Sequence, residues 1–106
     1  MHDIKWSETE KKLARRVFDA ALQRSLGDLM VEFKSKAERV TTPEEMWAMQ
    51  DYLRAKQLEF ETTYDYRYSQ LLLVFGSLLR QGRIRESELL GLSEEKLGYI
   101  QRIATL

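Results

Sequence analysis

Cysteine is absent from this 106-residue chain, and histidine and proline each occur only once. The lack of cysteine excludes disulfides and thiolate chemistry. The one histidine, His2, leaves no Ser-His or Cys-His pair in the body of the chain, and no Glu-x-x-His motif of a helical di-metal site. The glycines are isolated, so no glycine-rich phosphate loop is present. We therefore predict a protein without catalytic residues, metal or cofactor, and not an enzyme.

An excess of charge of one sign is also lacking, as are long apolar runs. Lysine plus arginine and aspartate plus glutamate both number 17, which gives a formal charge of +0. A nucleic-acid or anionic-membrane binder normally shows a basic excess. The most apolar run, from Leu71 to Phe75, is too short to span a bilayer. The sequence start, MHDIKWSETEKK, has no signal-peptide core. We expect a cytoplasmic protein with no nucleic-acid binding and no membrane insertion.

What the sequence does contain is helical patterning. Ser7 followed by Glu10 is the signature of a capped helix start, and apolar residues then recur at helical spacing as far as Val40. Their positions are Leu13, Val17, Ala20, Ala21, Leu26, Leu29, Met30, Phe33, Ala37 and Val40. A first helix is predicted over about 7–40.

A second helix is predicted over 43–81. Thr42 is a suitable N-cap, Pro43 fits the first helical position, and the next strong stop signal is Gly82. One stretch is ambiguous, because Tyr64, Tyr66 and Tyr68 alternate with polar residues in the period of two that is typical of a strand. Helical patterns on both sides and the absence of turn residues favour helix there.

The predicted length of the second helix suggests an assembly. Thirty-nine helical residues span about 58 Å, whereas a compact domain of this size has a radius of gyration of about 13 Å. Such a helix overhangs its own globule, and a second copy of the chain is the simplest cover for its apolar residues. We expect a homodimer with two-fold symmetry.

Beyond Gly82 the pattern predicts a small helical head over 83–106. A short turn over 86–90 ends at Gly91, and Ser93 caps a last helix that runs to about Ala104. The head is expected to fold back over the 71–79 half of the second helix. The predicted fold is therefore one all-α domain (1–106) with two long antiparallel helices and a C-terminal helical head.

Two surface features are candidates for binding. Trp47, with Met46 and Met49 beside it, is either a core cluster or an interface anchor, and the overhanging helix favours an interface. Cationic residues gather near the head, where they are either a patch for an acidic partner or, more simply, helix C-terminal charges and solvated loops. These cations are Arg80, Arg83, Arg85, Lys96 and Arg102.

An ordered set of residues over nearly the whole chain resembles the fluorescence recovery protein family of cyanobacteria. The set comprises Trp6-Ser7, Trp47, Asp51-Tyr52-Leu53, Ala55-Lys56, Tyr64-Asp65, Arg67, Ser69, Val74-Phe75, Gly82, Glu88-Leu89 and Glu95-Lys96. The resemblance implies an all-helical homodimer that is not an enzyme. It also implies binding to the orange carotenoid protein, whose return from the red active form to the orange form is accelerated so that quenching of the phycobilisome ends.

The resemblance also indicates which residues serve binding. Trp47 and Asp51 match family positions near the dimer interface that matter for activity. Two neighbours depart from the family: Gln50 replaces a histidine, and Gln57 replaces an arginine. Because a carboxylate at an interface needs a cation, Arg54 is the substitute partner for Asp51. The predicted partner-binding or dimer-interface residues are Met46, Trp47, Gln50, Asp51, Arg54, Gln57 and Phe75.

The departures at Gln50 and Gln57 keep an alternative open. The protein would then be a dimeric helical interaction protein of the same family, from an organism without phycobilisomes, that binds a different protein partner.

Overall fold

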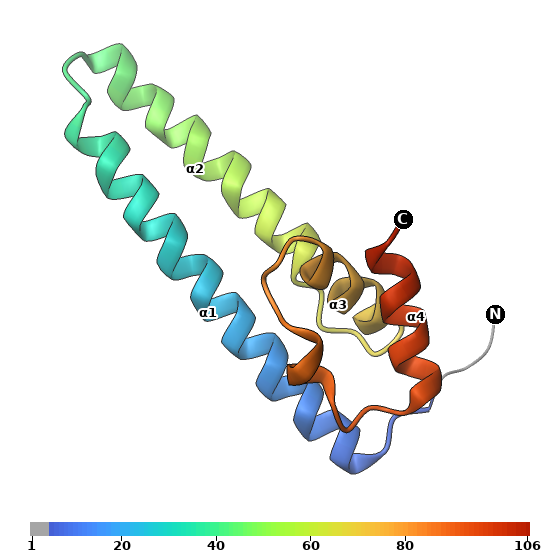
Figure 1. Cartoon of the computed structure of the whole chain (residues 1–106). Helices are drawn as coiled ribbons and strands as arrows, with labels where there is room; N and C mark the ends of the chain where they lie inside the picture. The colour runs from blue at the N-terminus through green and yellow to red at the C-terminus, as the bar shows by residue number, and fades with distance from the viewer. Residues whose placement is uncertain (1–4) are drawn as a thin grey trace.

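The computed structural model describes residues 5–106, so His2 lies outside it. The helices are α1 (Glu8–Glu38), α2 (Pro43–Thr63), α3 (Leu71–Arg80) and α4 (Glu94–Ala104), with a short 3₁₀ helix, η1 (Glu86–Leu89). No strand occurs within the described range. Helices α1 and α2 run antiparallel as a hairpin, and α3, η1 and α4 gather at its lower end as a head (Figure 1). The predicted all-α class, hairpin and head are confirmed.

Local capping explains most helix boundaries. Ser7 and Glu10 form the predicted capping box at the start of α1. The Thr42 hydroxyl accepts from the Glu45 amide at 3.1 Å, with Pro43 in the first turn of α2. Ser93 accepts from the Lys96 amide at 3.2 Å and starts α4. The predicted first and last helices are confirmed.

The predicted continuous helix over 43–81 is wrong. Helix α2 ends at Thr63, residues 64–70 are not helical, and α3 begins at Leu71. Since α3 packs with α4, it is part of the head, whose predicted start at residue 83 is therefore too late. The expected 58 Å rod does not exist, yet the molecule is elongated, with extents of 53 × 26 × 25 Å and a radius of gyration of 16.9 Å.

Aromatic packing against α1 explains the break. The rings of Tyr64 and Tyr66 meet Phe18 edge-on, with centroids 5.6 and 4.9 Å away. The Arg15 guanidinium lies 3.5 Å from the centre of the Tyr66 ring, and Tyr68 follows at 5.8 Å from Tyr66. Edge-on aromatic contacts and a cation over a ring stabilise this non-helical segment against α1. The strand-like alternation of the three tyrosines was the correct signal, and the preference for helix there was wrong.

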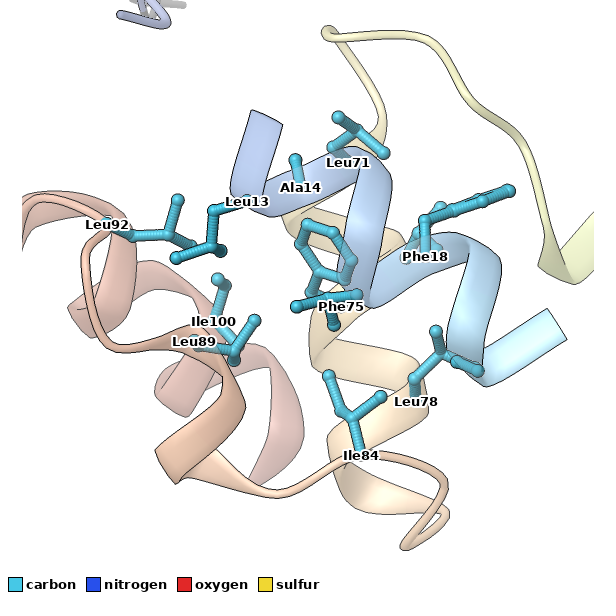
Figure 2. Packing of buried hydrophobic residues seen from close by; sticks show 13 residues of the cluster. Leu13, Ala14, Phe18, Leu71, Phe75, Leu78, Ile84, Leu89, Leu92 and Ile100 are labelled. Carbon is cyan, nitrogen blue, oxygen red and sulfur yellow. The ribbon is translucent and has the colours of Figure 1, made fainter. Parts of the chain in front are cut away.

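The hydrophobic core lies where the head meets the N-terminal half of α1 (Figure 2). Phe75, at its centre, has no exposed surface. The buried apolar residues are Leu13, Ala14, Val17, Phe18, Ala21, Leu71, Val74, Phe75, Leu78, Ile84, Leu89, Leu92 and Ile100. None comes from α2. The chain turns after α3 at Gly82 and between η1 and α4 at Gly91. These glycines have φ angles of 72° and 117°, a region that residues with a side chain rarely adopt.

A buried ion pair fixes α4 to the start of α1. Lys96 Nζ donates to Glu10 Oε1 at 3.1 Å and to the Lys5 carbonyl at 2.6 Å. Glu10 also accepts from the Ser7 amide at 3.0 Å and from the Ser93 amide at 2.9 Å. One carboxylate therefore joins the N-termini of two helices, and its hydrogen bonds offset the cost of burying the charge.

Candidate protein interface

Helix α2 has two different sides. Its residues Met49, Tyr52, Lys56, Phe60 and Thr63 recur every three or four positions and are half-buried. This spacing places them on one side of the helix, which faces α1 because Lys36 of α1 lies over the Tyr52 ring. The opposite side is exposed, and α2 contains no buried residue at all. Helix α2 therefore offers a whole face to the surroundings.

The outward face of α2 carries large apolar side chains that are not covered within the protomer. Trp47 is 63% exposed and Leu58 64% exposed on this face, and Met46 and Leu53, which helical spacing places on its flank, are 51% and 40% exposed. Single exposed apolar residues are ordinary, but an aromatic and aliphatic row along one helix marks an interaction site. We call this row, together with the polar residues between its members, the α2 outer face.

Six of the seven predicted site residues lie on α2 and are exposed: Met46, Trp47, Gln50, Asp51, Arg54 and Gln57. The helical period brings Trp47, Gln50, Asp51 and Arg54 onto the outer face. Phe75 does not join them, because it is fully buried at the centre of the head core. Its contacts within the protomer are those of a packing residue.

Three exposed apolar residues were missed as members of a surface. Leu58 lies one turn beyond Arg54 on the outer face, so its helical spacing was the available signal. Met30, which was expected on the buried side of the first helix, is 57% exposed, and its neighbour Val31 is 70% exposed. Both belong to the half of α1 that extends beyond the head. A periodic apolar pattern cannot distinguish a helix face covered by the same chain from one left open.

The charges of the outer face are not compensated within the part of the chain that the structure describes. Among residues 5–106, neither Asp51 nor Arg54 takes part in an ion pair. Both are exposed, so water solvates them in the isolated protomer. A carboxylate and a guanidinium one helical turn apart, set among apolar side chains, can each receive an opposite charge from a docking partner.

The inner side of α2 meets α1 at Tyr52, in the middle of the helix. Lys36 Nζ lies 4.9 Å from the centre of the Tyr52 ring. Burial of the Tyr52 hydroxyl, followed by the nearby Glu32 and Glu59 carboxylates, raises the pKa of Tyr52. A cavity of about 290 Å³ lies there, lined in part by Arg39, Ala48 and Tyr52.

Three of the five cations near the head make contacts within the protomer. Lys96 is buried against Glu10, and Arg83 pairs with Asp28 of α1 at 2.8 Å. Arg102 lies 4.7 Å from the centre of the Tyr99 ring. The simpler interpretation of these charges, as local helix and loop charges, agrees with these contacts.

Within the described residues, no group of three or more histidine, aspartate or glutamate side chains is placed to hold a metal ion. No described helix is long and apolar enough to cross a membrane. The surface that remains as a candidate functional site is the α2 outer face.

Comparison with known proteins decides the family. The profile described as "Photoprotection regulator fluorescence recovery protein" matches residues 6–104. The chain belongs to the fluorescence recovery protein family. The fluorescence recovery protein of Synechocystis sp. is 34% identical over 101 residues, covering 95% of this chain and 93% of the relative. Members of this family are regulators, and the prediction that the protein is not an enzyme is confirmed.

Structures of the family have the same fold. The fluorescence recovery protein of Fremyella diplosiphon is 32% identical and superposes with a TM-score of 0.90 over 96% of this chain and 100% of that one. The Synechocystis protein gives the same TM-score and coverage at 33% identity. The break after Thr63 and the separate α3 therefore occur within a fold that matches experimental structures of fluorescence recovery proteins along almost the entire chain.

Proposed function

We propose that this protein is a regulatory adaptor that binds an orange carotenoid protein and accelerates its return from the red active form to the orange form. Relief of phycobilisome quenching would follow. The near full-length match to a family of photoprotection regulators supports this proposal most directly. The adaptor uses no cofactor of its own and acts in the cytoplasm.

The physical requirement for this role is differential binding. A partner changes a conformational equilibrium, or the rate of crossing it, only by binding one state or the transition state more tightly. An adaptor for this purpose needs a surface with apolar anchors and unpaired charges rather than a catalytic constellation. The α2 outer face, with Trp47 exposed and Asp51 and Arg54 unpaired in the described chain, has these properties.

We further propose that the adaptor is a homodimer that buries the α2 outer face of both protomers. In a two-fold interface the same patch serves both partners, so a contact from residue i to residue j occurs twice. Asp51 of one protomer opposite Arg54 of the other would give two symmetric ion pairs. The apolar row of Met46, Trp47 and Leu58 would fill the contact between them.

A second candidate function rests on two residues. Gln50 and Gln57 lie on the exposed part of α2, and both are neutral where the resemblance implies histidine and arginine. A neutral amide cannot make the ion pairs of a guanidinium. A family member with a different protein partner would show this kind of change at its binding surface.

The deciding experiment is optical. An orange carotenoid protein is converted to its red form by light, and its return in the dark is followed with and without this protein at equal concentration. Faster recovery supports the adaptor role. Unchanged recovery and no co-elution, with a folded protein, would reject that role and favour the second candidate.

Two variants sharpen this assay. Trp47→Glu is expected to abolish the acceleration, because it places a carboxylate in the proposed surface. Ala48→Glu is the matched control, since Ala48 is an exposed residue of α2 on the flank that lines the cavity beside Arg39. If both variants lose the acceleration of recovery equally, the charge on α2 governs binding and the outer face does not.

A further inference from the structure

Helix α2 packs against α1 through a side that is only half-buried along its length. It has no buried residue, and its inner side is only half-buried. The close contacts between elements join α3 with α4, and α1 with η1 and α3. The head core likewise receives no residue from α2. Helix α2 is therefore less firmly held than the helices of the head, and each specific contact with α1 carries more of its attachment.

The lower end of α2 is attached to α1 through Tyr64, the residue at which the helix stops. The Tyr64 hydroxyl lies 2.6 Å from the Ser25 hydroxyl and donates to the Ala21 carbonyl at 3.3 Å. The Tyr64 ring meets Phe18 of the core edge-on and stacks on Phe60, the last ring of α2, at 5.6 Å. One side chain thus connects α2, the core and the middle of α1.

Ser25 gives this connection a specific partner. It is 4% exposed, so its hydroxyl is a buried polar group whose hydrogen bond to Tyr64 replaces the water it has lost. Loss of the Tyr64 hydroxyl would leave Ser25 without that partner, and a buried hydroxyl without a partner is costly. The contact is therefore stronger than its position at a helix end suggests.

We propose that Tyr64 is a latch for α2. With the latch closed, α2 lies along α1 and presents its outer face in a fixed direction; with the latch open, α2 separates from α1 while the head remains folded. The latch belongs to the protomer and does not depend on the identity of any partner. It makes α2 a unit of lower stability than the head, in the way that local openings in proteins follow contiguous elements.

Hydrogen exchange on the full chain tests this separation. Tyr64→Phe keeps the ring and removes the hydroxyl. We expect the amides of α2 to exchange about five- to tenfold faster in this variant, as the loss of about one net hydrogen bond implies, with α3 and α4 unchanged. Tyr99→Phe removes a tyrosine hydroxyl from the head instead and should leave α2 unaffected.

A double-variant cycle identifies the partner in the latch. Ser25→Ala should accelerate exchange in α2 as Tyr64→Phe does. In the combined variant the exchange rate of the α2 amides should be little higher than in either single variant, because both substitutions remove the same contact. Full additivity would mean that the two hydroxyls act separately, and the latch as described would be wrong.

A distance measurement gives an independent readout. The chain has no cysteine, so Gln23→Cys in α1 and Ala55→Cys in α2, both at exposed positions, can carry a pair of spin labels. Labelled protein is diluted with a large excess of unlabelled protein, so that distances within one protomer dominate. Tyr64→Ala should broaden the distance distribution toward longer values, and Tyr99→Ala should not.

Two results would overturn the proposal, provided that light scattering gives the same mass for variant and parent. If exchange in α2, α3 and α4 rises together, Tyr64 contributes only to global stability. If exchange in α2 and the label distances stay unchanged, α2 is held by other contacts.

Discussion

Among single residues, Glu10 has the greatest number of structural roles. Its two oxygens cap α1 through Ser7, hold the Ser93 amide at the start of α4 and bind the buried ammonium of Lys96. Burial of this carboxyl acts to raise its pKa, but the hydrogen bonds from Ser7 and Ser93, together with Lys96, outweigh that effect and hold the pKa of Glu10 below its usual range. The charged form is therefore the one that the folded protein stabilises.

The variant Glu10→Gln should destabilise the fold by about 3 kcal/mol. It keeps the shape of the side chain but leaves the Lys96 ammonium buried without a counter-charge, and that is the costly way to break a buried pair. The measurement is urea unfolding, read as a lower midpoint at an unchanged slope. Glu8→Gln is the control, because the Glu8–Lys11 pair lies on the surface and is worth less than about 1 kcal/mol. Similar losses in both variants would contradict the role given to Glu10.

The same residue sets a pH dependence. Because the pKa of Glu10 is lower in the folded than in the unfolded protein, its stabilising effect is present above the unfolded value of about 4.3 and is lost as the pH falls through the folded value. Unfolding midpoints measured from pH 6 down to pH 3 should therefore fall less in Glu10→Gln than in the parent protein. An identical acid profile in the two proteins would assign the loss to other carboxyl groups.

Among the elements, α3 and α4 are joined by the closest approach in the head. A Cβ atom added to Gly76 would overlap the Cβ and Cγ2 atoms of Ile103 and come within 3.3 Å of the Ile100 carbonyl. Gly98, by contrast, has nothing within 4 Å of such an atom. A glycine-to-alanine substitution is therefore expected to have opposite effects on stability at these two positions.

Gly76→Ala should destabilise the protein by about 1 to 3 kcal/mol, because α3 and α4 must move apart. Gly98→Ala should instead stabilise it by up to about 1 kcal/mol, since alanine is the better helix former and the position is open. Thermal or urea unfolding of both variants gives the comparison. Stabilisation by both substitutions would show that the contact with Ile103 is not tight.

The element scale also explains which parts of the fold the sequence could predict. Ser7, Thr42 and Ser93 mark helix starts with local chemistry, so these boundaries were predicted correctly. The end of α2 has no proline or glycine, and α3 begins at Leu71 after an N-cap residue, Gln70, whose side chain makes no capping hydrogen bond. The break between α2 and α3 is caused by the packing of Tyr64 and its neighbours on a part of α1 that is distant in the sequence. Local sequence rules do not contain that information.

The candidate site also has a part that the sequence could predict and a part that it could not. Residues of α2 such as Trp47 and Arg54 share a side of the helix, which helical spacing alone determines, and their role in binding stays a prediction. Phe75 was grouped with them through the resemblance, whereas the structure buries it in the head. Whether an apolar residue is covered depends on the packing of other elements, and the sequence pattern gives no direct measure of it.

At the scale of the whole molecule, the uncovered α2 is the feature that most needs a partner. Met46→Glu and Trp47→Glu should each shift the protein from dimer to monomer in light scattering, because a carboxylate would be desolvated at the centre of the proposed interface. A stable interface buries about 800 Å² on each partner, which requires most of the outer face. The control Ala48→Glu, on the flank of α2 that lines the cavity beside Arg39, should stay dimeric. An unchanged dimer mass in both test variants would place the interface elsewhere.

The continuity of α1 has a mechanical consequence. Its first half is clamped in the head core, and the part beyond Ser25 projects as a rigid rod of about 20 Å toward the hairpin tip. A tilt of about 5° at the clamped half swings the far end by about 2 Å, as simple geometry on that rise per residue requires. The protomer is in this sense a lever with its fulcrum near Phe18. Substitutions that alter the angle of α1 in the head will therefore move the start of α2 without changing a residue there.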